Sequence, residues 1–307
     1  MTINNISPAG QAFVNGINQI SQKLSTATQE ISSGLKLTTA ADDPAQVNDL
    51  LQLRADRQLN TQIASNLTMA NSIASAADTA IGSSIQLINT AIQVGTQAAN
   101  SLTSQTTDTS LAVEVQGMLT QMVNYSQSQV QGQYIFSGDQ PGSPAYGLNS
   151  AAAKGVDQLL TVTATQQVQD PAGGSFAASK TAQQVFDTQN ADGTPATDNA
   201  FAALHNLIVA LQTGDTTGIQ SSLANLQAAS KHLNAAQSFY GVVENRIQTA
   251  TSYSTSHDTQ LQTQIGSIQD ADTVSDALVL AQSNTQLQAA FAAQSQIPKS
   301  TLFNYLT

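Results

Sequence analysis

The chain of 307 residues contains no cysteine and no tryptophan, and aromatic residues make up only 5% of it. Without cysteine, disulfides, thiol catalysis and thiolate metal sites are all excluded. The scarcity of aromatic side chains disfavours a wide globular core. A chain of this length can form two domains, but it can also form one long helical rod.

Charged residues are also scarce, at 9% against roughly 25% in an ordinary soluble protein. The formal net charge is −11, and the nine Lys and Arg residues form no cluster, so we expect no nucleic-acid partner and no binding to an anionic membrane surface. Gln, Asn, Ser, Thr and Ala replace the missing charges. Their amides and hydroxyls can form hydrogen bonds across a subunit contact, which predicts a surface that is buried against neighbouring chains.

The sequence has no run of 18 apolar residues, and its first residues lack a basic segment followed by an apolar run and a cleavage site. We therefore expect neither membrane insertion nor a cleaved secretory signal. If the protein leaves the cell, it must use a route that recognises another feature.

Apolar residues recur at alternating spacings of four and three near both ends of the chain, as in a coiled-coil seam. The first seam consists of Phe13, Ile17, Ile20, Leu24, Ala27 and Ile31. The second seam consists of Ala277, Leu280, Asn284, Leu287 and Phe291. An isolated helix of about 20 residues is only marginally stable in water, so we predict that both seams find their counterparts in adjacent chains. Asn284 is polar on an apolar seam and could fix the register or the number of partners.

The long middle of the chain reads as two helical rods around an insert. Gly34 is placed to end the first helix, and Asp43 with Pro44 is a start signal for the next helix, predicted to run from residue 45 to about 101. Over its central part this helix has a heptad pattern of apolar residues, which are Ile63, Leu67, Ala70, Ala74, Ala77, Ile81, Ile88 and Ala91. A helix capped by Asp108 should continue to about residue 131, and a heptad pattern returns over residues 219–268 with polar breaks near Ser254 and Asp258. Asp272 or Thr273 should start the last helix.

The segment from residue 139 to about 198 is rich in Gly, Pro, Asp, Asn and Ser. It contains an alternating piece, Leu160 to Ala164, and several turn signals, which predict a small β-rich insert. A disordered loop remains the alternative. A short helix over residues 201–211 should follow, ending near Gly214 and capped by one of three residues, Thr197, Asp198 or Asn199.

These patterns predict a mainly α protein, an elongated antiparallel helical rod or coiled coil with a small β-rich insert. The expected segments are 1–44, 45–136, 137–200, 201–270 and 271–307. The first and last are coiled-coil segments, the second and fourth are rods, and the third is the insert.

No group of residues has the spacing of a catalytic, cofactor or metal site. His205, His232 and His257 are scattered, and a helix cap explains Asp43 better than a catalytic pair with Asp42 does. The glycines form neither a phosphate-binding loop nor a nucleophile elbow. We therefore expect no enzyme, no cofactor and no metal.

Three arginines are informative because cations are few. Arg54, Arg57 and Arg246 could lie on solvated helix faces. Alternatively, they could pair with a carboxylate or amide of another chain and so fix the axial register of the assembly.

Several segments resemble the flagellin family. The stretch from Glu30 to Ala45 resembles the N-terminal signature of flagellins, and the stretches 241–246, 268–273 and 289–306 resemble their C-terminal region. The residues of this chain that fall on the matching motifs, or beside them, are Ser33, Gly34, Asp42, Asp43, Pro44, Arg54, Asn245 and Arg246.

Within the family, the stretch Gly132 to Gly138, with Tyr134 and Phe136, resembles the hook-associated members. So does the ending, with Leu302, Phe303 and Leu306. Residues 32–36 are closer to flagellin itself, so a filament subunit remains the alternative.

The resemblance implies a structural subunit of the bacterial flagellum that joins hook to filament. Its terminal helices would line an inner tube as a coiled-coil layer, and the insert would face outward. Its partners would be further copies of the chain, flagellin, other hook-associated proteins and an export chaperone. Export would proceed unfolded through the flagellar type III apparatus, which places the protein outside the cell.

Overall fold

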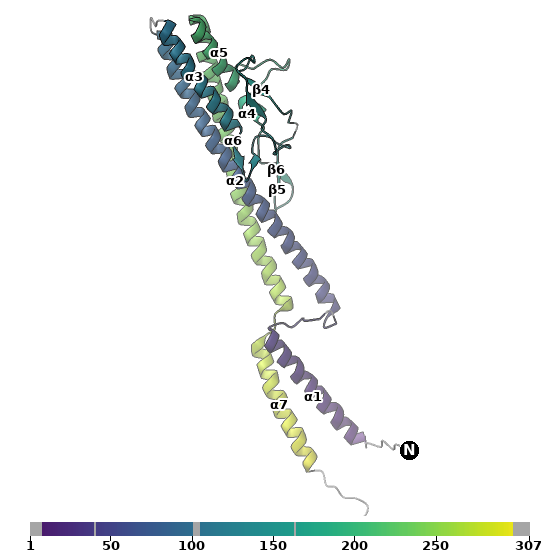
Figure 1. The fold of residues 1–307 in the computed structure, drawn as a ribbon. Coiled ribbons are helices and arrows are strands. Elements are labelled where there is room, and N and C mark those ends of the chain that lie inside the picture. The colour runs from purple at the N-terminus through teal and green to yellow at the C-terminus, as the bar shows by residue number, and fades with distance from the viewer. Residues whose placement is uncertain (1–7, 40, 101–104, 163, 297–307) are drawn as a thin grey trace, which may run out of the picture. The chain divides into compact units, whose positions relative to one another are not determined.

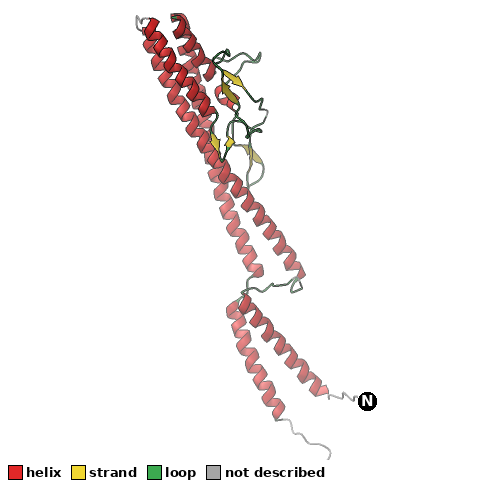
Figure 2. Ribbon diagram, in the orientation of Figure 1, coloured by secondary structure: helices red, strands yellow, loops and turns green. Residues whose placement is uncertain are grey.

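The computed structural model describes residues 8–39, 41–100, 105–162 and 164–296, and these are mainly helical (Figures 1 and 2). The chain divides into two compact units, which we call unit 1 (residues 1–59 and 258–307) and unit 2 (residues 60–257). The helices are α1 (Pro8–Ser33), α2 (Pro44–Asn100), α3 (Gln105–Ser126), α4 (Ala182–Phe186), α5 (Ala200–Thr213), α6 (Thr216–Gln269) and α7 (Thr273–Ser295). The strands are β1 (Gln129–Val130), β2 (Gln133–Tyr134), β3 (Tyr146–Leu148), β4 (Val156–Gln158), β5 (Gln167–Gln169) and β6 (Ser175–Ala177).

In unit 2, α2 and α6 run antiparallel, as predicted for the two rods. The side chain of Asn60 bonds to Ser254, and that of Asn89 bonds to Ser230, so residue numbers rise along one helix as they fall along the other. The predicted heptad is confirmed on α2, where the fully buried residues recur every seven positions at Leu67, Ala74, Ile81 and Ile88. Helices α3 and α5 pack on each other beside this pair (Figure 1).

Helix α3 differs from its predicted bounds. It begins at Gln105, so Asp108 lies in its first turn, where the helix dipole favours a carboxylate, rather than before it. It ends at Ser126, because the following residues form the β1–β2 hairpin instead of further helical turns. The two residues between these strands, Gln131 and Gly132, both have positive φ (51° and 78°), the conformation that a two-residue hairpin turn requires.

The insert is folded, as predicted, and its described residues form two antiparallel strand pairs, β3–β4 and β5–β6, and the short helix α4. The β1–β2 hairpin precedes it. The alternating piece from Leu160 to Ala164, one of the signals for this insert, forms no strand at its described residues 160–162 and 164. They pack against Gly138, at which an added Cβ would collide with the carbonyl oxygen of Ala164 and with Cγ1 of Val162.

The insert attaches to the helices through a cluster of aromatic rings. Phe136 is fully buried and meets Phe186 edge-on at 5.3 Å between ring centroids and Tyr240 of α6 at 6.5 Å. Phe186 in turn contacts Phe201 of α5, which contacts Tyr146 of β3. The few aromatic residues of the chain are thus concentrated where the insert needs a core of its own.

Predicted helix ends are confirmed on α5 and α7. Asn199 caps α5 by accepting a hydrogen bond from the backbone N–H of Ala202, and Gly214 ends α5 with φ of 68°. Asp272 caps α7 by accepting from the N–H groups of Val274 and Ser275.

The expected polar breaks in α6 do not occur. Ser254 is buried and bonds to Asn60, and Asp258 pairs with Arg57, so both polar residues serve contacts with α2 within a continuous helix.

Candidate assembly interface

Unit 1 brings the two ends of the chain together through a joint, which we define as residues 34–39 and 41–43 with residues 270–272. The backbone N–H of Lys36 donates to the carbonyl of Gln269 at 2.7 Å, and that of Ala271 donates to the carbonyl of Gly34 at 3.0 Å. Gly34 has φ of 70° and ends α1, as predicted. Leu35 and Asp270 therefore pair as an antiparallel bridge between segments far apart in sequence.

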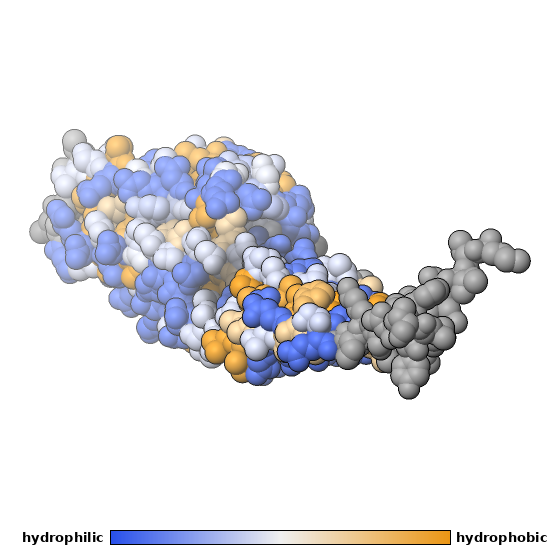
Figure 3. All heavy atoms as spheres, turned by 90° about the horizontal axis from the view of Figure 1, so that it is seen from below, coloured by the Kyte–Doolittle hydropathy of each residue, from blue (hydrophilic) through white to orange (hydrophobic). Residues whose placement is uncertain are grey.

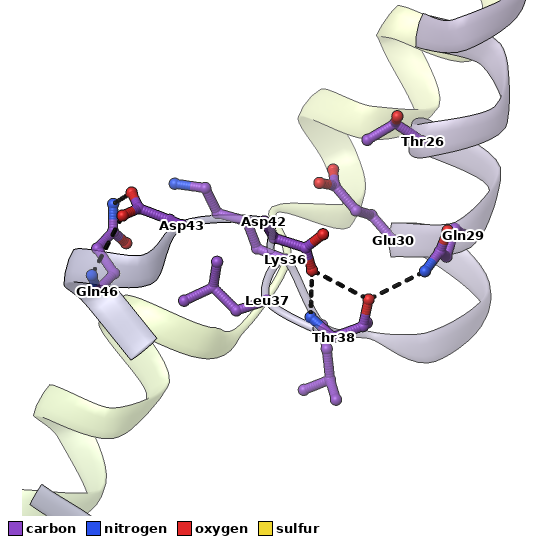
Figure 4. A pocket seen from close by; sticks show the side chains of 10 residues that line it. Thr26, Gln29, Glu30, Lys36, Leu37, Thr38, Asp42, Asp43 and Gln46 are labelled. Carbon is purple, nitrogen blue, oxygen red and sulfur yellow. Dashed lines mark hydrogen bonds between the residues drawn. The ribbon is translucent and has the colours of Figure 1, made fainter. Parts of the chain in front are cut away.

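Asp42 holds the turn of the joint, and Asp43 starts α2. One carboxylate oxygen of Asp42 accepts from the backbone N–H groups of Thr38 and Thr39, at 2.9 and 2.7 Å. These bonds and that from the Thr39 hydroxyl, with the largest effect from the Thr39 backbone, lower the pKa of Asp42 to about 2. Asp43 accepts from the N–H groups of Ala45 and Gln46. Asp42 and Asp43 thus both have structural roles. Their carboxylates line a pocket of about 330 Å³ between α1, the joint and α2 (Figure 4).

Helices α1 and α7 pack against each other within the chain. Ala27 and Glu30 near the end of α1 line one pocket together with Asp276 and Val279 near the start of α7, so the two helices run antiparallel away from the joint. The inward-facing residues of α1 coincide with the first seam: Phe13, Ile17, Ile20 and Leu24 are half-buried and Ala27 is buried, whereas Ile31 is exposed. The expectation that this seam is covered only by an adjacent chain was therefore wrong, because α7 lies against it.

The packed face of α7 differs from the second seam. Leu280 and Leu287 are half-buried, but the buried position between them is Ser283. Ala277, Asn284 and Phe291 are exposed, the last to 54%. Val274 and Leu278, exposed to 80% and 60%, also lie outside the contact. Helix α7 therefore also carries exposed apolar side chains outside its contact with α1. Figure 3 shows hydrophobic residues scattered among hydrophilic ones on the face of the molecule that it presents.

The three arginines have partners within their own chain, which corrects the idea that they pair with another chain. Arg54 donates to the Gln269 side chain at 2.8 Å, and Arg57 lies 3.0 Å from Asp258. Arg246 lies 3.5 Å from Asp170 and stacks on Phe176 at 4.2 Å from the ring centroid, which anchors the β5–β6 hairpin to α6. Its neighbour Asn245 is exposed and bonds to its own helix.

The histidines occupy separate structural positions. Burial lowers the pKa of His205, whose Nδ1 has no hydrogen-bond partner. His232 lies between Asp198 and the Gln184 carbonyl, and His257 stacks on Tyr253. Among the described residues, no three His, Cys, Asp or Glu side chains group as they would around a metal ion. No helix in the same part of the chain is long and apolar enough to cross a bilayer.

Residues in the stretch from 132 to 138, which resembles the hook-associated members, have structural roles. Phe136 belongs to the aromatic cluster, Tyr134 is half-buried, and Gly138 has φ of 51° beside a backbone carbonyl that leaves no room for a side chain. The positions Leu302, Phe303 and Leu306 lie outside the described residues.

Sequence reasoning missed a polar cluster inside the insert. The buried carboxylate of Asp187 accepts hydrogen bonds from Tyr146, Lys154, Gln189 and Asn199, at 2.8, 2.5, 3.0 and 2.6 Å. Burial, together with the charge of Asp187, raises the pKa of the Tyr146 hydroxyl. No short sequence motif predicts this cluster, because its members are spread along the whole insert. Each of them, taken alone, is typical of a loop residue.

Comparison with known proteins gives two family matches. The model of the bacterial flagellin N-terminal helical region matches residues 3–140, and that of the C-terminal helical region matches residues 223–306.

Two curated relatives are proteins named flagellar hook-associated protein 3. The one from Salmonella typhimurium is 27% identical over 192 residues, which are 60% of this chain and 59% of that protein. The one from Escherichia coli is 26% identical with the same shares. The chain thus spans about three fifths of the length of the curated relatives it matches.

Solved structures share the fold. A putative flagellar hook-associated protein from Vibrio parahaemolyticus has a TM-score of 0.64 at 17% identity, over 75% of this chain and 100% of that chain. The flagellar junction protein FlgL from Legionella pneumophila has a TM-score of 0.56 at 15% identity, over 72% of this chain and 100% of that chain. Because both helical regions of flagellin match, in order and at opposite ends of the sequence, the chain belongs to the flagellin family.

Proposed function

We propose that this protein is a structural subunit of the bacterial flagellum that joins the hook to the filament. The observation that carries the proposal is that its named relatives over 192 residues are hook-associated proteins rather than filament flagellins. The similarity of fold to a flagellar junction protein supports the same assignment. The role is mechanical, and we assign no catalysis to the chain.

In this proposal the segments 1–44 and 271–307 form the assembling part of the subunit. The exposed apolar side chains of α7, Val274, Leu278 and Phe291, would pack on the terminal helices of neighbouring copies. Burial of such side chains stabilises a contact by roughly 1.5–3 kcal/mol each. Head-to-tail contacts between identical chains do not close on themselves unless their rotation forms a ring.

The partners would be further copies of the chain, flagellin and other hook-associated proteins, with the insert at residues 137–200 facing outward. Before assembly, an export chaperone would hold the C-terminal region. The protein would reach the outside of the cell through the flagellar type III apparatus.

Electron microscopy of flagella that carry a labelled copy of this protein tests the proposal. We expect label confined to the boundary between hook and filament, and a strain without the gene should produce hooks that hold no filament. Label along the whole filament would instead identify a filament flagellin.

Truncation gives a second test. Chains that lack residues 1–40 or 273–307 should remain soluble but should not assemble with the full-length chain. Assembly of either truncated chain would contradict the assignment of the assembling part.

A further inference from the structure

Two carboxyl groups meet where α1 packs on α7. Glu30 lies in the last turns of α1, and Asp276 lies in the first turn of α7. Both line the same pocket between the two helices, and the Glu30 side chain projects away from the α1 axis into the space beside the joint (Figure 4). The two groups belong to opposite ends of the sequence, so only closure of the α1–α7 contact brings them together.

One oxygen of this pair lacks a hydrogen bond. Oδ2 of Asp276 is buried and has no donor. An unsatisfied buried acceptor costs free energy, and a carboxylate cannot donate to a second carboxylate. A proton on one of the two groups would supply the missing donor and would remove the repulsion between two negative charges.

We propose that a protonated Glu30 donates a hydrogen bond to Asp276 across the α1–α7 contact, and that this pair is a pH-dependent catch which holds the terminal helices together in acid and loosens them as the pH rises. The catch is a property of the isolated chain. Its use in assembly, where loosening would free the first seam for a neighbouring copy, rests on the proposed function.

The groups around Glu30 determine the direction in which its pKa shifts, and therefore the direction of the pH dependence. Burial, followed by the hydrogen bond that a protonated Glu30 can donate to Asp276 and by the charge of Asp276, raises the pKa of Glu30, with a smaller contribution from Asp42 in the joint. Lys36, also in the joint, opposes this, and Lys23 of α1 lines the same pocket. Because the pKa of Glu30 is raised when the helices are closed, the closed state binds the proton more tightly. Its extra stability is therefore present below the ordinary glutamate pKa and is lost as the pH rises through the raised value.

The absence of cysteine in the chain makes a direct test simple. The changes Ser21→Cys on α1 and Gln286→Cys on α7, both at exposed positions, would carry a donor and an acceptor fluorophore on the full-length chain. Energy transfer, measured between about pH 4 and pH 8, reports the ratio of closed to open terminal helices. We expect this ratio to rise at least about twofold on acidification.

Substitutions at Glu30 and Asp276 test whether these two residues cause the pH dependence. Glu30→Gln keeps a hydrogen-bond donor but carries no charge, so its helices should stay closed over the whole range without a titration step. Asp276→Asn should behave in the same way, and it serves as a second test if the first variant loses helical structure. Glu114→Gln, an exposed change on α3, should titrate like the parent chain. A flat or inverted titration of the parent chain, or an unchanged titration in both pair variants, would overturn the proposal. Because this readout needs no assembly, its failure is distinct from failure of the proposed function.

Discussion

The side chains of Asn60 on α2 and Ser254 on α6 form a reciprocal pair of hydrogen bonds inside the helical contact. The amide Nδ2 of Asn60 donates to the backbone carbonyl of Ser254, and the Ser254 hydroxyl donates to Oδ1 of Asn60, both at 2.9 Å. Both residues are buried, at 5% and 2% exposed. Since apolar contacts alone permit sliding by a heptad, this pair specifies the axial register of α2 against α6.

Asn60→Ala should destabilise unit 2 by about 1–3 kcal/mol, because it leaves the buried Ser254 hydroxyl without its acceptor and removes a second hydrogen bond to the Ser254 carbonyl. Urea unfolding followed by circular dichroism measures the change. The exposed Asn66→Ala on the same helix is the matched control and should change the free energy of unfolding by less than about 0.5 kcal/mol. Equal effects of the two changes would refute the register role.

Two glycines with similar backbone conformations should respond differently to alanine. Gly132→Ala adds a methyl group in open space at φ of 78°, so it should cost roughly 1–2 kcal/mol of backbone strain alone. Gly138→Ala has φ of 51° and also drives its methyl group against the carbonyl of Ala164. Its cost should exceed that of Gly132→Ala, as measured by thermal unfolding of both variants. The reverse order would mean that the insert around Gly138 can move apart freely.

The aromatic cluster should carry much of the stability of the insert. Phe136→Ala removes a fully buried ring with two edge-on partners, and we expect a loss of about 3–5 kcal/mol. Proteolysis should then cleave within residues 137–200 before it cleaves the helices. Phe291→Ala, which removes a half-exposed ring on α7, should leave the unfolding transition of unit 2 unchanged.

The joint should loosen in acid through Asp42. Its folded pKa of about 2 lies below the ordinary aspartate value of 3.8, so the ionised form is favoured in the folded joint. The stability that it contributes is present above pH 3.8 and is lost as the pH falls towards 2. A carboxyl-detected NMR titration should place Asp42 near 2, and Asp42→Asn should show faster amide exchange at Thr38 and Thr39. An ordinary pKa would contradict the observed hydrogen bonds.

The two faces of α7 predict separable effects. Leu278→Asp alters the exposed face, so it should leave the α1–α7 contact intact and weaken assembly in sedimentation experiments. Leu280→Asp alters the face that packs on α1 and should open that contact, as fluorescence energy transfer between labelled helices would report. If Leu278→Asp assembles normally, the exposed face is not part of the interface.

The features that could be predicted are those encoded locally or by repetition. The heptad of α2 repeats often enough to reveal its buried face, and Asn199, Gly214 and Asp272 each mark a helix end within a few residues. Helix caps involve only neighbours in sequence, so a short motif determines them.

The features that could not be predicted depend on distant partners. Ser254 reads as a break in a heptad, because its partner Asn60 lies 194 positions away. On α7, apolar residues surround the helix, so the sequence alone does not decide whether Ser283 or Asn284 faces α1. The small Ser283 allows a closer approach of the helices, and that preference becomes visible only when α1 is in place.

The backbone bridge between Leu35 and Asp270 has a consequence for how such a chain can lengthen. It closes a circuit that contains every residue between these two positions, while α1 and α7 lie outside the circuit. Extra residues added to a surface loop of the insert would enlarge the circuit at an entropic cost that grows only with the logarithm of its length. The terminal helices would keep the same starting points, so the insert can diversify in size without any change in the helices that we assign to contacts with neighbouring copies.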